Sequence, residues 1–293
     1  MLTLVFEQEP AALPDANARE ICVWRDNSGA TFARAFARDG WRWIEWHGLG
    51  VFTFSLGSTT VHARAATSVR ESVVADAFAR VIQPIILQAL GRQALHASAV
   101  LGTEGVIAFC GVGRSGKSTL AYALGHQGYR QVADDALVIE PAGFHIRAHL
   151  LPFIPGLREP SRHHFDDQQT AVHSKVPVAD AAPATLQNAP LRAVFLLRQS
   201  GSLSEPERPQ RVSPVQAFSA LVTHARCFDE ADASHTRRLI DDYLLVAERV
   251  PVFSIDYPPR FVQLPWLLGV VKTVARDLGV AELSAARQPV AIE

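Results

Sequence analysis

The first quarter of the chain alternates short apolar runs with polar turns, a pattern typical of a small antiparallel sheet. Strands are expected at residues 20–24, 41–46 and 50–54, and residues 26–29 have the composition of a turn. The aromatic side chains of this stretch would also suit a platform on which nucleic-acid bases stack, but few basic residues lie among them. We therefore interpret them as the inward faces of a sheet and predict a small β-rich N-terminal domain over residues 1–75.

The apolar spacing then changes to a helical period over residues 69–90. Pro84 is expected to break or kink this helix, because proline has no amide hydrogen and its ring collides with the preceding turn. A second helical piece follows and should end at Gly91. The apolar positions that carry the first piece are Val73, Val74, Ala77, Phe78 and Val81.

The centre of the chain has the order strand, loop, helix, strand. Residues 97–101 and 106–110 are predicted as adjacent buried strands, and a glycine-rich loop follows them. A helix over residues 118–124 and a strand region over residues 132–139 complete the unit. This order is typical of the nucleotide-binding core of an α/β protein.

The last part of the chain begins with a polar segment rich in alanine and proline, residues 157–190, which we interpret as a mobile lid or substrate loop. Regular patterns resume after it. Strands are expected at residues 191–197 and 252–256, and helices at 214–227, 234–250 and 261–278.

Composition and charge narrow the class of protein. The chain has 293 residues, 48% of them hydrophobic, which excludes a mostly disordered chain. A net charge of -1 supplies no global attraction to nucleic acid or to an anionic membrane. Three well-separated cysteines fit a reducing compartment, and no run approaches the twenty apolar residues of a bilayer span. We expect a soluble cytoplasmic protein without nucleic-acid or membrane partners.

The strongest motif is a phosphate-binding loop of the form G-x-x-x-x-G-K-[ST] at residues 111–118. Gly111 and Gly116 let the backbone curl so that successive amides face an anion, and the following helix adds its positive end. Lys117 supplies a charge to the outer phosphates, and the Ser118 hydroxyl suits a Mg²⁺ ion that bridges two of them. The rest of the predicted nucleotide-binding set is Gly113, Arg114, Ser115 and Thr119.

Marks of several large P-loop classes are missing, namely the guanine motif Asn-Lys-x-Asp, the transporter motif Leu-Ser-Gly-Gly-Gln and the Asp-Glu-Ala-Asp box. Present instead are His96 before the loop and the pair Asp134 and Asp135 after the helix. Adjacent carboxylates at a strand end can serve Mg²⁺ and a hydroxyl proton, provided that the strand ends there, since neighbouring strand residues otherwise face opposite ways. The remaining interpretations are a solvated turn for the pair and a core histidine for His96.

With the loop, the runs Leu95-His96-Ala97-Ser98-Ala99-Val100 and Gly128–Asp135 resemble the HPr serine kinase/phosphorylase family, especially its short divergent relatives. The resemblance is strong over residues 80–139 and weaker over 194–198 and 250–264. It implies an α/β fold with a P-loop kinase core related to phosphoenolpyruvate carboxykinase, here over residues 76–293, and phosphoryl transfer from ATP to a serine. It also implies that Asp135 is the base toward the acceptor, while Asp134 holds the metal or pairs with His96.

The chain departs from the full-length family, because it lacks the segment that grips HPr and a counterpart of the phosphorylase loop. This argues against HPr as the substrate, and some short relatives resemble kinases that tailor ribosomal peptides such as lasso-peptide precursors. By the resemblance, Glu159 falls near the place of a further metal ligand, and Arg158 beside it is a candidate charge-stabilising cation. A solvated loop is the alternative for both.

Two further possibilities carry less weight. Residues 161–167 bring His163, His164 and two aspartates together, but adjacent histidines on a flexible segment seldom form a preorganised metal site. A hydrolase is not expected, because the G-x-S-x-G elbow is missing.

The leading hypothesis is therefore an ATP- and Mg²⁺-dependent serine kinase acting on a peptide or small protein. The alternatives are a nucleotide-binding regulatory module without transfer activity and a small-molecule kinase, for example of free serine. The sequence is also compatible with a homo-oligomer.

Overall fold

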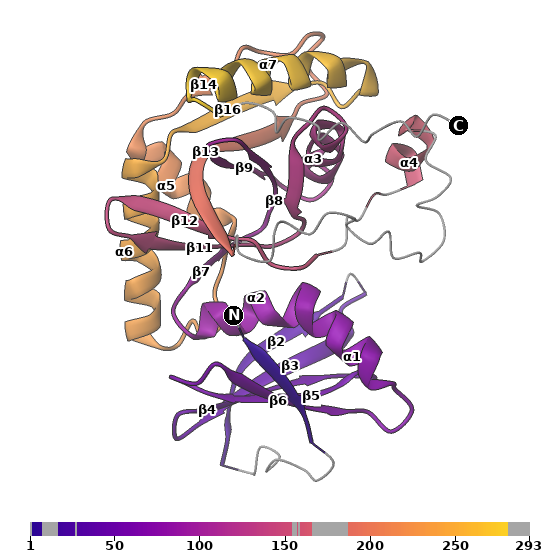
Figure 1. Cartoon of the computed structure of the whole chain (residues 1–293), viewed down its shortest axis with the longest axis vertical. Helices are drawn as coiled ribbons and strands as arrows, with labels where there is room; N and C mark the ends of the chain where they lie inside the picture. The colour runs from indigo at the N-terminus through magenta and orange to yellow at the C-terminus, as the bar shows by residue number, and fades with distance from the viewer. Residues whose placement is uncertain are drawn as a thin grey trace, which may run out of the picture. The chain divides into compact units, whose positions relative to one another are not determined.

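The computed structural model describes residues 2–7, 17–26, 28–153, 157, 159–165 and 187–280 (Figure 1). The chain forms two compact units, one of Met1–Ala94 with Arg226–Asp241 and one of Leu95–Ala225 with Asp242–Glu293. The sequence prediction placed a boundary after residue 75. The smaller unit instead also takes in the helices up to Ala89 and a second, distant segment, since Phe78 stacks on Phe52 and Phe228 contacts Phe54.

The smaller unit contains a six-stranded sheet. The predicted strands are confirmed, and the pairing is antiparallel except between β1 and β6. Trp43, Phe52 and Phe54 are buried, whereas Trp41 at the strand end is 44% exposed. The strands, in spatial order, are β1 (Thr3–Phe6), β6 (Thr60–Ala65), β5 (Gly50–Ser55), β4 (Trp41–Trp46), β3 (Thr31–Arg38) and β2 (Arg19–Arg25).

Pro84 does not break the helix that follows the sheet. Helix α1 (Glu71–Ala77) continues through a π-helical turn, η1 (Phe78–Ile82), into α2 (Gln83–Ala89). The wider turn ends at Ile82, and Pro84 then lies in the first turn of α2, where its missing amide hydrogen costs least. The predicted end at Gly91 is confirmed, because Gly91 has φ +90° and its amide donates to the Gln88 carbonyl in a Schellman motif.

Sheet topology places the carboxyl ends of three parallel strands side by side in the larger unit. Strand β13 (Asn188–Gln199) pairs in parallel with β9 (Gly105–Cys110) and with β16 (Val252–Tyr257). On the other side of β9 lie β8 (Ala97–Gly102) and then β10 (Arg130–Ala133), both antiparallel to their neighbours. The remaining strands are β7 (Gln93–Leu95), β11 (Leu137–Ala142), β12 (His145–His149), β14 (Gln210–Arg211) and β15 (Ala225–Arg226).

The predicted helices of the larger unit are confirmed apart from their ends, but α4 (Glu159–Phe165) was not predicted, because it lies in the segment interpreted as a lid or substrate loop. Helix α5 begins with a capping box, in which the Ser213 hydroxyl accepts from the Gln216 amide and the Gln216 side chain accepts in return. The helices are α3 (Lys117–Gly125), α4 (Glu159–Phe165), α5 (Pro214–Thr223), α6 (Ala233–Arg249), the short η3 (Phe261–Gln263) and α7 (Leu264–Asp277).

The predicted strand over residues 132–139 is wrong as one element. The chain forms β10, a turn at Asp134–Asp135 and then β11, and Asp135 has a left-handed φ of +63°. Aspartate tolerates this conformation better than most residues. The interruption matters for the site, because it satisfies the condition under which both carboxylates can face the loop. Most of the predicted lid, residues 166–186, lies outside the described residues.

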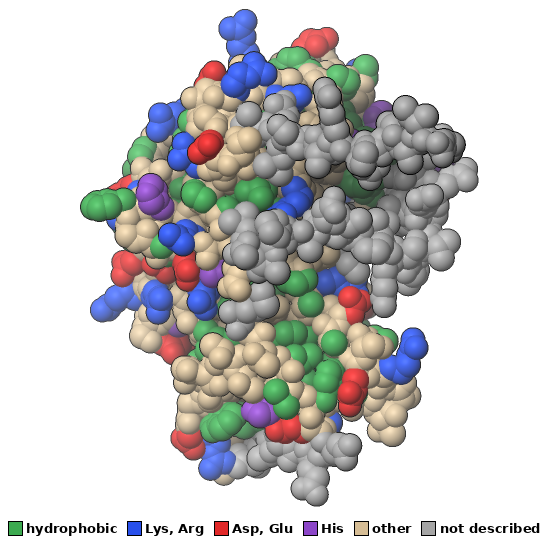
Figure 2. Space-filling model, in the orientation of Figure 1, with side chains coloured by type: hydrophobic (Ala, Val, Ile, Leu, Met, Phe, Trp, Pro, Cys, Tyr) green, Lys and Arg blue, Asp and Glu red, His purple; other side chains and the backbone are tan. Residues whose placement is uncertain are grey.

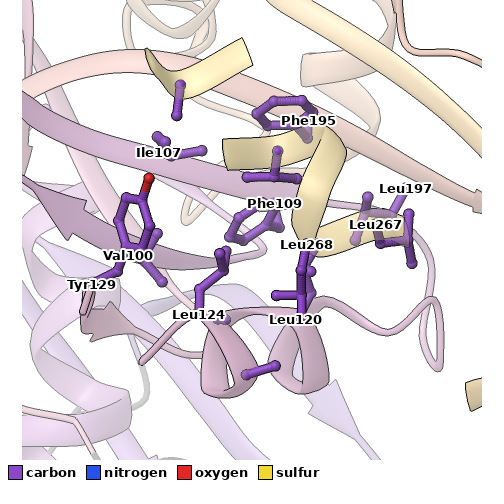
Figure 3. Packing of buried hydrophobic residues seen from close by; sticks show 14 of the residues in the cluster. Val100, Ile107, Phe109, Leu120, Leu124, Tyr129, Phe195, Leu197, Leu267 and Leu268 are labelled. Carbon is purple, nitrogen blue, oxygen red and sulfur yellow. The ribbon is translucent and has the colours of Figure 1, made fainter. Parts of the chain in front are cut away.

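The main core of the larger unit lies between the sheet and helices α3 and α7 (Figure 3). The rings of Phe109, Phe195 and Phe253 lie in register on neighbouring strands and stack in sequence. Leu120 and Leu124 of α3 pack against this face together with Leu267 and Leu268 of α7 (Figure 3). The core therefore fixes the start of α3 relative to the strand ends.

Acidic and basic side chains are interspersed on the face shown in Figure 2. One described helical stretch, Glu71–Ala89, is long and apolar enough to cross a membrane by length and composition, and 56% of its apolar window is buried within the structure. A core helix of a soluble protein has the same properties. The expectation of no membrane partner therefore stays a prediction.

We predict that Phe109→Ala lowers the free energy of unfolding by about 3–5 kcal/mol, because it removes a fully buried ring and leaves a cavity. Phe144, which is 90% exposed, provides the matched control, and Phe144→Ala should change stability by less than about 0.5 kcal/mol. Urea unfolding of both variants measures the difference. Equal losses would contradict the position of the core.

Candidate functional site

The glycine-rich segment forms the predicted loop between β9 and α3. Gly116 has φ +83° and is the N-cap of α3, and Arg114 also has a left-handed φ, +69°. The loop is closed by a hydrogen bond from the Ser115 amide to the Val112 carbonyl. It thus delivers the chain to the amino end of a nine-residue helix, where backbone amides attract an anion.

A tyrosine at the end of β16 makes a hydrogen bond to this loop. The hydroxyl of Tyr257 donates to the Ser115 carbonyl, and the Gln199 amide nitrogen lies 3.5 Å from the same hydroxyl. Tyr257 and Gln199 are paired residues at the ends of β16 and β13, and burial raises the pKa of the tyrosine. A Cβ atom on Gly116 would lie 2.7 Å from the Tyr257 hydroxyl oxygen, so only glycine fits there.

Two polar groups of the loop fit a bound phosphate. The Lys117 ammonium is buried and donates to the carbonyls of Gly111, at 2.8 Å, and Val112, at 3.2 Å, which folds it back over the loop. The Ser115 hydroxyl oxygen is buried and has no hydrogen-bond partner among the described residues. An unmade hydrogen bond of this kind is costly in a protein interior, and an anion in the loop would satisfy it.

Asp134 lies directly against the loop. Its Oδ1 accepts hydrogen bonds of 2.7 Å from the Ser118 hydroxyl and 2.7 Å from the Ser98 hydroxyl, and the two hydroxyl oxygens are 3.5 Å apart. Carboxylate and hydroxyl oxygens are the donor types that Mg²⁺ takes, usually with one or two protein carboxylates and the phosphates of a nucleotide. The donor set therefore fits the predicted magnesium ion.

Asp135 and His96 line the same cavity as the loop. Asp135 is exposed. The backbone carbonyl oxygen of Asp135 lies 3.1 Å from Nδ1 of His96. A carbonyl can only accept, so this contact needs a hydrogen on Nδ1. His96 thus contacts the backbone of the acidic pair, and its own amide donates to the carbonyl of His224 at 2.7 Å.

Two neighbouring groups are held uncharged. Burial, Lys117 and His96 together lower the pKa of His224. Burial raises the pKa of the fully buried Cys110 to about 12, so this thiol stays protonated at the strand-to-loop junction. Neither group therefore adds a charge next to the loop at neutral pH.

Glu159 is the predicted site residue that the structure does not bring to the loop. It starts α4, its side chain is 84% exposed, and it lies 3.8 Å from His163 on the same helix. Ser161, two residues on, does reach the site, since its hydroxyl lies 2.8 Å from that of Thr119. Among the described residues no three His, Cys, Asp or Glu side chains converge on one point, and Arg158 lies outside them.

The loop opens into a cavity of about 520 Å³. One wall is the loop with the first turn of α3, and a second carries His96 and Asp135. Leu157 and Ser161 also line it. The wall contributed by the ends of β13 and β16 and by the start of α7 consists of Gln199, Tyr257, Pro259, Arg260, Phe261, Leu264 and Leu267.

Sequence reasoning missed Ser98 and Tyr257. Ser98 lies two residues after His96, and the period of two along a strand could have placed both on one face. Tyr257 is the last residue of β16, and no local pattern indicates that its hydroxyl reaches a loop 142 residues away.

Comparison with known proteins finds matches among solved structures but none by sequence. No protein-family model matches the chain, and no curated protein matches it. Among solved structures, the Hpr(Ser) kinase/phosphatase from Coxiella burnetii is similar at 12% identity and a TM-score of 0.33, over 64% of this chain and 99% of its own. A TM-score this low does not establish a shared fold or activity. The chemistry of the site is therefore inferred only from the contacts within this chain.

We predict that Gly116→Ala lowers the free energy of unfolding by about 1–3 kcal/mol, because the new Cβ meets the Tyr257 hydroxyl and the backbone stays left-handed. Gly113→Ala is the control in the same loop, since nothing lies within 4 Å of its added Cβ, and it should cost less than about 0.5 kcal/mol. Denaturant unfolding compares the two. If the Gly116→Ala protein were as stable as wild type, the close contact between Gly116 and the Tyr257 hydroxyl would be wrong.

Proposed function

We propose that the chain binds ATP with Mg²⁺ in the loop at residues 111–118 and transfers the γ-phosphoryl group to a hydroxyl group. The observation that carries the proposal is the hydrogen bond between the Asp134 carboxylate and the Ser118 hydroxyl. It supports a cation site next to an anion-binding loop, which is the arrangement that phosphoryl transfer needs.

Each residue of the loop has a role that follows from its contacts. Lys117 exchanges the loop carbonyls for phosphate oxygens, and Ser115 turns its unpaired hydroxyl to the same anion. Ser118 and Asp134 would hold Mg²⁺, with Ser98 orienting the carboxylate. The ion, when bound, neutralises charge on the transferring group.

Asp135 is proposed as the base. Its carboxylate lines the cavity beside the loop, where it accepts the proton of the acceptor hydroxyl as that oxygen bonds to the γ-phosphorus and ADP leaves. His96 holds the Asp135 backbone carbonyl and so positions the turn that carries the base.

A cytoplasmic location and the possibility of a homo-oligomer stay predictions.

The proposed acceptor is a serine of a peptide or small protein. Its support is the resemblance of the motifs at His96, the loop and the acidic pair to those of the HPr-kinase family. There are two alternatives: transfer to free serine, and ATP binding without transfer to any acceptor.

We expect label transfer from γ-labelled ATP to a serine peptide in the presence of Mg²⁺, and Lys117→Ala and Asp135→Asn should each lower it by at least about 100-fold. Asp134→Asn should raise the Mg²⁺ concentration needed for half-maximal rate, because it removes a charged ligand. Asp39→Asn is the isosteric control: Asp39 lies in a turn of the smaller unit, its side chain is 81% exposed, and its left-handed φ suits asparagine.

The three proposals fail separately in this assay. If Asp135→Asn transfers phosphate at the wild-type rate, Asp135 is not the base. If Asp134→Asn needs no more Mg²⁺ than wild type, Asp134 does not bind the metal. Tight ATP binding without transfer to peptides or free serine would support the regulatory alternative.

A further inference from the structure

The strand order gives the cavity two opposite flanks. The loop follows β9, and the neighbours of β9 are β8 on one side and β13 on the other, with β10 beyond β8 and β16 beyond β13. Asp135 follows β10 and His96 precedes β8, so the acidic pair and the histidine belong to one flank. The residues after β16 belong to the other.

The proposed chemistry uses only the first flank. An acceptor hydroxyl has to lie between the outer phosphate and Asp135, and so it approaches from the side of β8 and β10. The wall after β16 lines the same cavity, from Tyr257 to Leu267, yet no step of the transfer needs it. This wall is therefore free to hold another part of a ligand whose phosphates occupy the loop.

The side chains of this wall suit a flat, uncharged ring. Phe261 is 38% exposed, although it is a large apolar residue, and Pro259 and Leu264 line the cavity beside it. The His164 ring already stacks on Phe261, with centroids 4.5 Å apart and planes 14° from parallel. The Phe261 ring thus accepts an aromatic heterocycle at stacking distance.

Arg260 adds a cation to the same wall, and it is exposed next to Phe261. A guanidinium stacks on aromatic rings and donates hydrogen bonds to ring nitrogens and carbonyl oxygens. Apolar contacts, an aromatic face and one fork of donors together match a nucleobase better than they match a phosphate or a carboxylate.

We infer that the wall after β16 is the nucleobase subsite, in which Phe261 stacks on the base and Arg260 contacts its edge. The inference rests on the proposed function, since it takes the triphosphate to lie in the loop. It assigns the two ends of the nucleotide to the two flanks of one cavity: phosphates toward the acids, base toward Phe261.

The test compares ATP with inorganic tripolyphosphate, which has the phosphates without the base, by titration calorimetry with Mg²⁺ on the full chain. Wild type should bind ATP more tightly than tripolyphosphate. Phe261→Ala should weaken ATP by roughly tenfold, because one stacked base is lost, and leave tripolyphosphate unchanged. Phe261→Trp should restore the ATP affinity.

Val262→Ala is the matched control. Val262 is the next residue, is 74% exposed and is not among the residues that line the cavity, so both affinities should equal those of wild type. Unchanged tripolyphosphate binding by Phe261→Ala also shows that the variant is folded and that its loop is intact.

The outcomes separate this inference from the proposed function. If wild type binds neither ligand, the nucleotide proposal itself fails. If both ligands bind but Phe261→Ala binds ATP as wild type does, the nucleobase subsite is wrong. A variant that binds ATP normally but has a raised KM for the acceptor peptide would assign Phe261 to the acceptor and overturn the inference.

Discussion

The site depends on one carboxylate that accepts hydrogen bonds from two hydroxyl groups, one on a helix and one on a strand. Asp134 accepts from Ser118 at the start of α3 and from Ser98 on β8, and this ties the turn after β10 to the loop after β9. Hydrogen bonds to a charged acceptor are stronger than those between neutral groups, so the contact holds the two segments together. Without it, a glycine-rich loop and a pair of acids would be separate features of the sequence.

The surrounding structure keeps this contact in place from the opposite side. Tyr257 at the end of β16 holds the Ser115 carbonyl, and the stacked rings of Phe109 and Phe195 fix the strands between. The loop is therefore braced by two groups from non-adjacent strands. Because the groups are already in place, no free energy is needed to order them before the reaction.

Much of this arrangement follows from local sequence, and part of it does not. The loop and α3 were predictable because glycine spacing and helix starts are local properties, and so was the antiparallel pair of β8 and β9. The break at Asp134–Asp135 was missed, because the apolar residues on both sides continue a strand pattern. The uninterrupted helix through Pro84 depends on a π-helical turn, which has no marker in composition.

Contacts across long stretches of chain lie beyond local patterns. The hydroxyl of Tyr257 reaches Ser115 only because β13 brings β16 beside β9, and Ser98 meets Asp134 only because β10 pairs with β8. Glu159 is the reverse case. The family resemblance implied a metal ligand at this position, whereas the exposed side chain of Glu159 lies beside His163. Topology, rather than residue type, decides which acids reach the loop.

The most direct measurement is a crystal structure with Mn²⁺ and a non-hydrolysable ATP analogue, in which anomalous scattering locates the metal. We predict a Mn²⁺ peak next to the Ser118 hydroxyl oxygen and the Asp134 carboxylate, with the triphosphate in the loop at residues 111–118. A metal or a triphosphate bound away from Ser118 and Asp134 would contradict the proposed site.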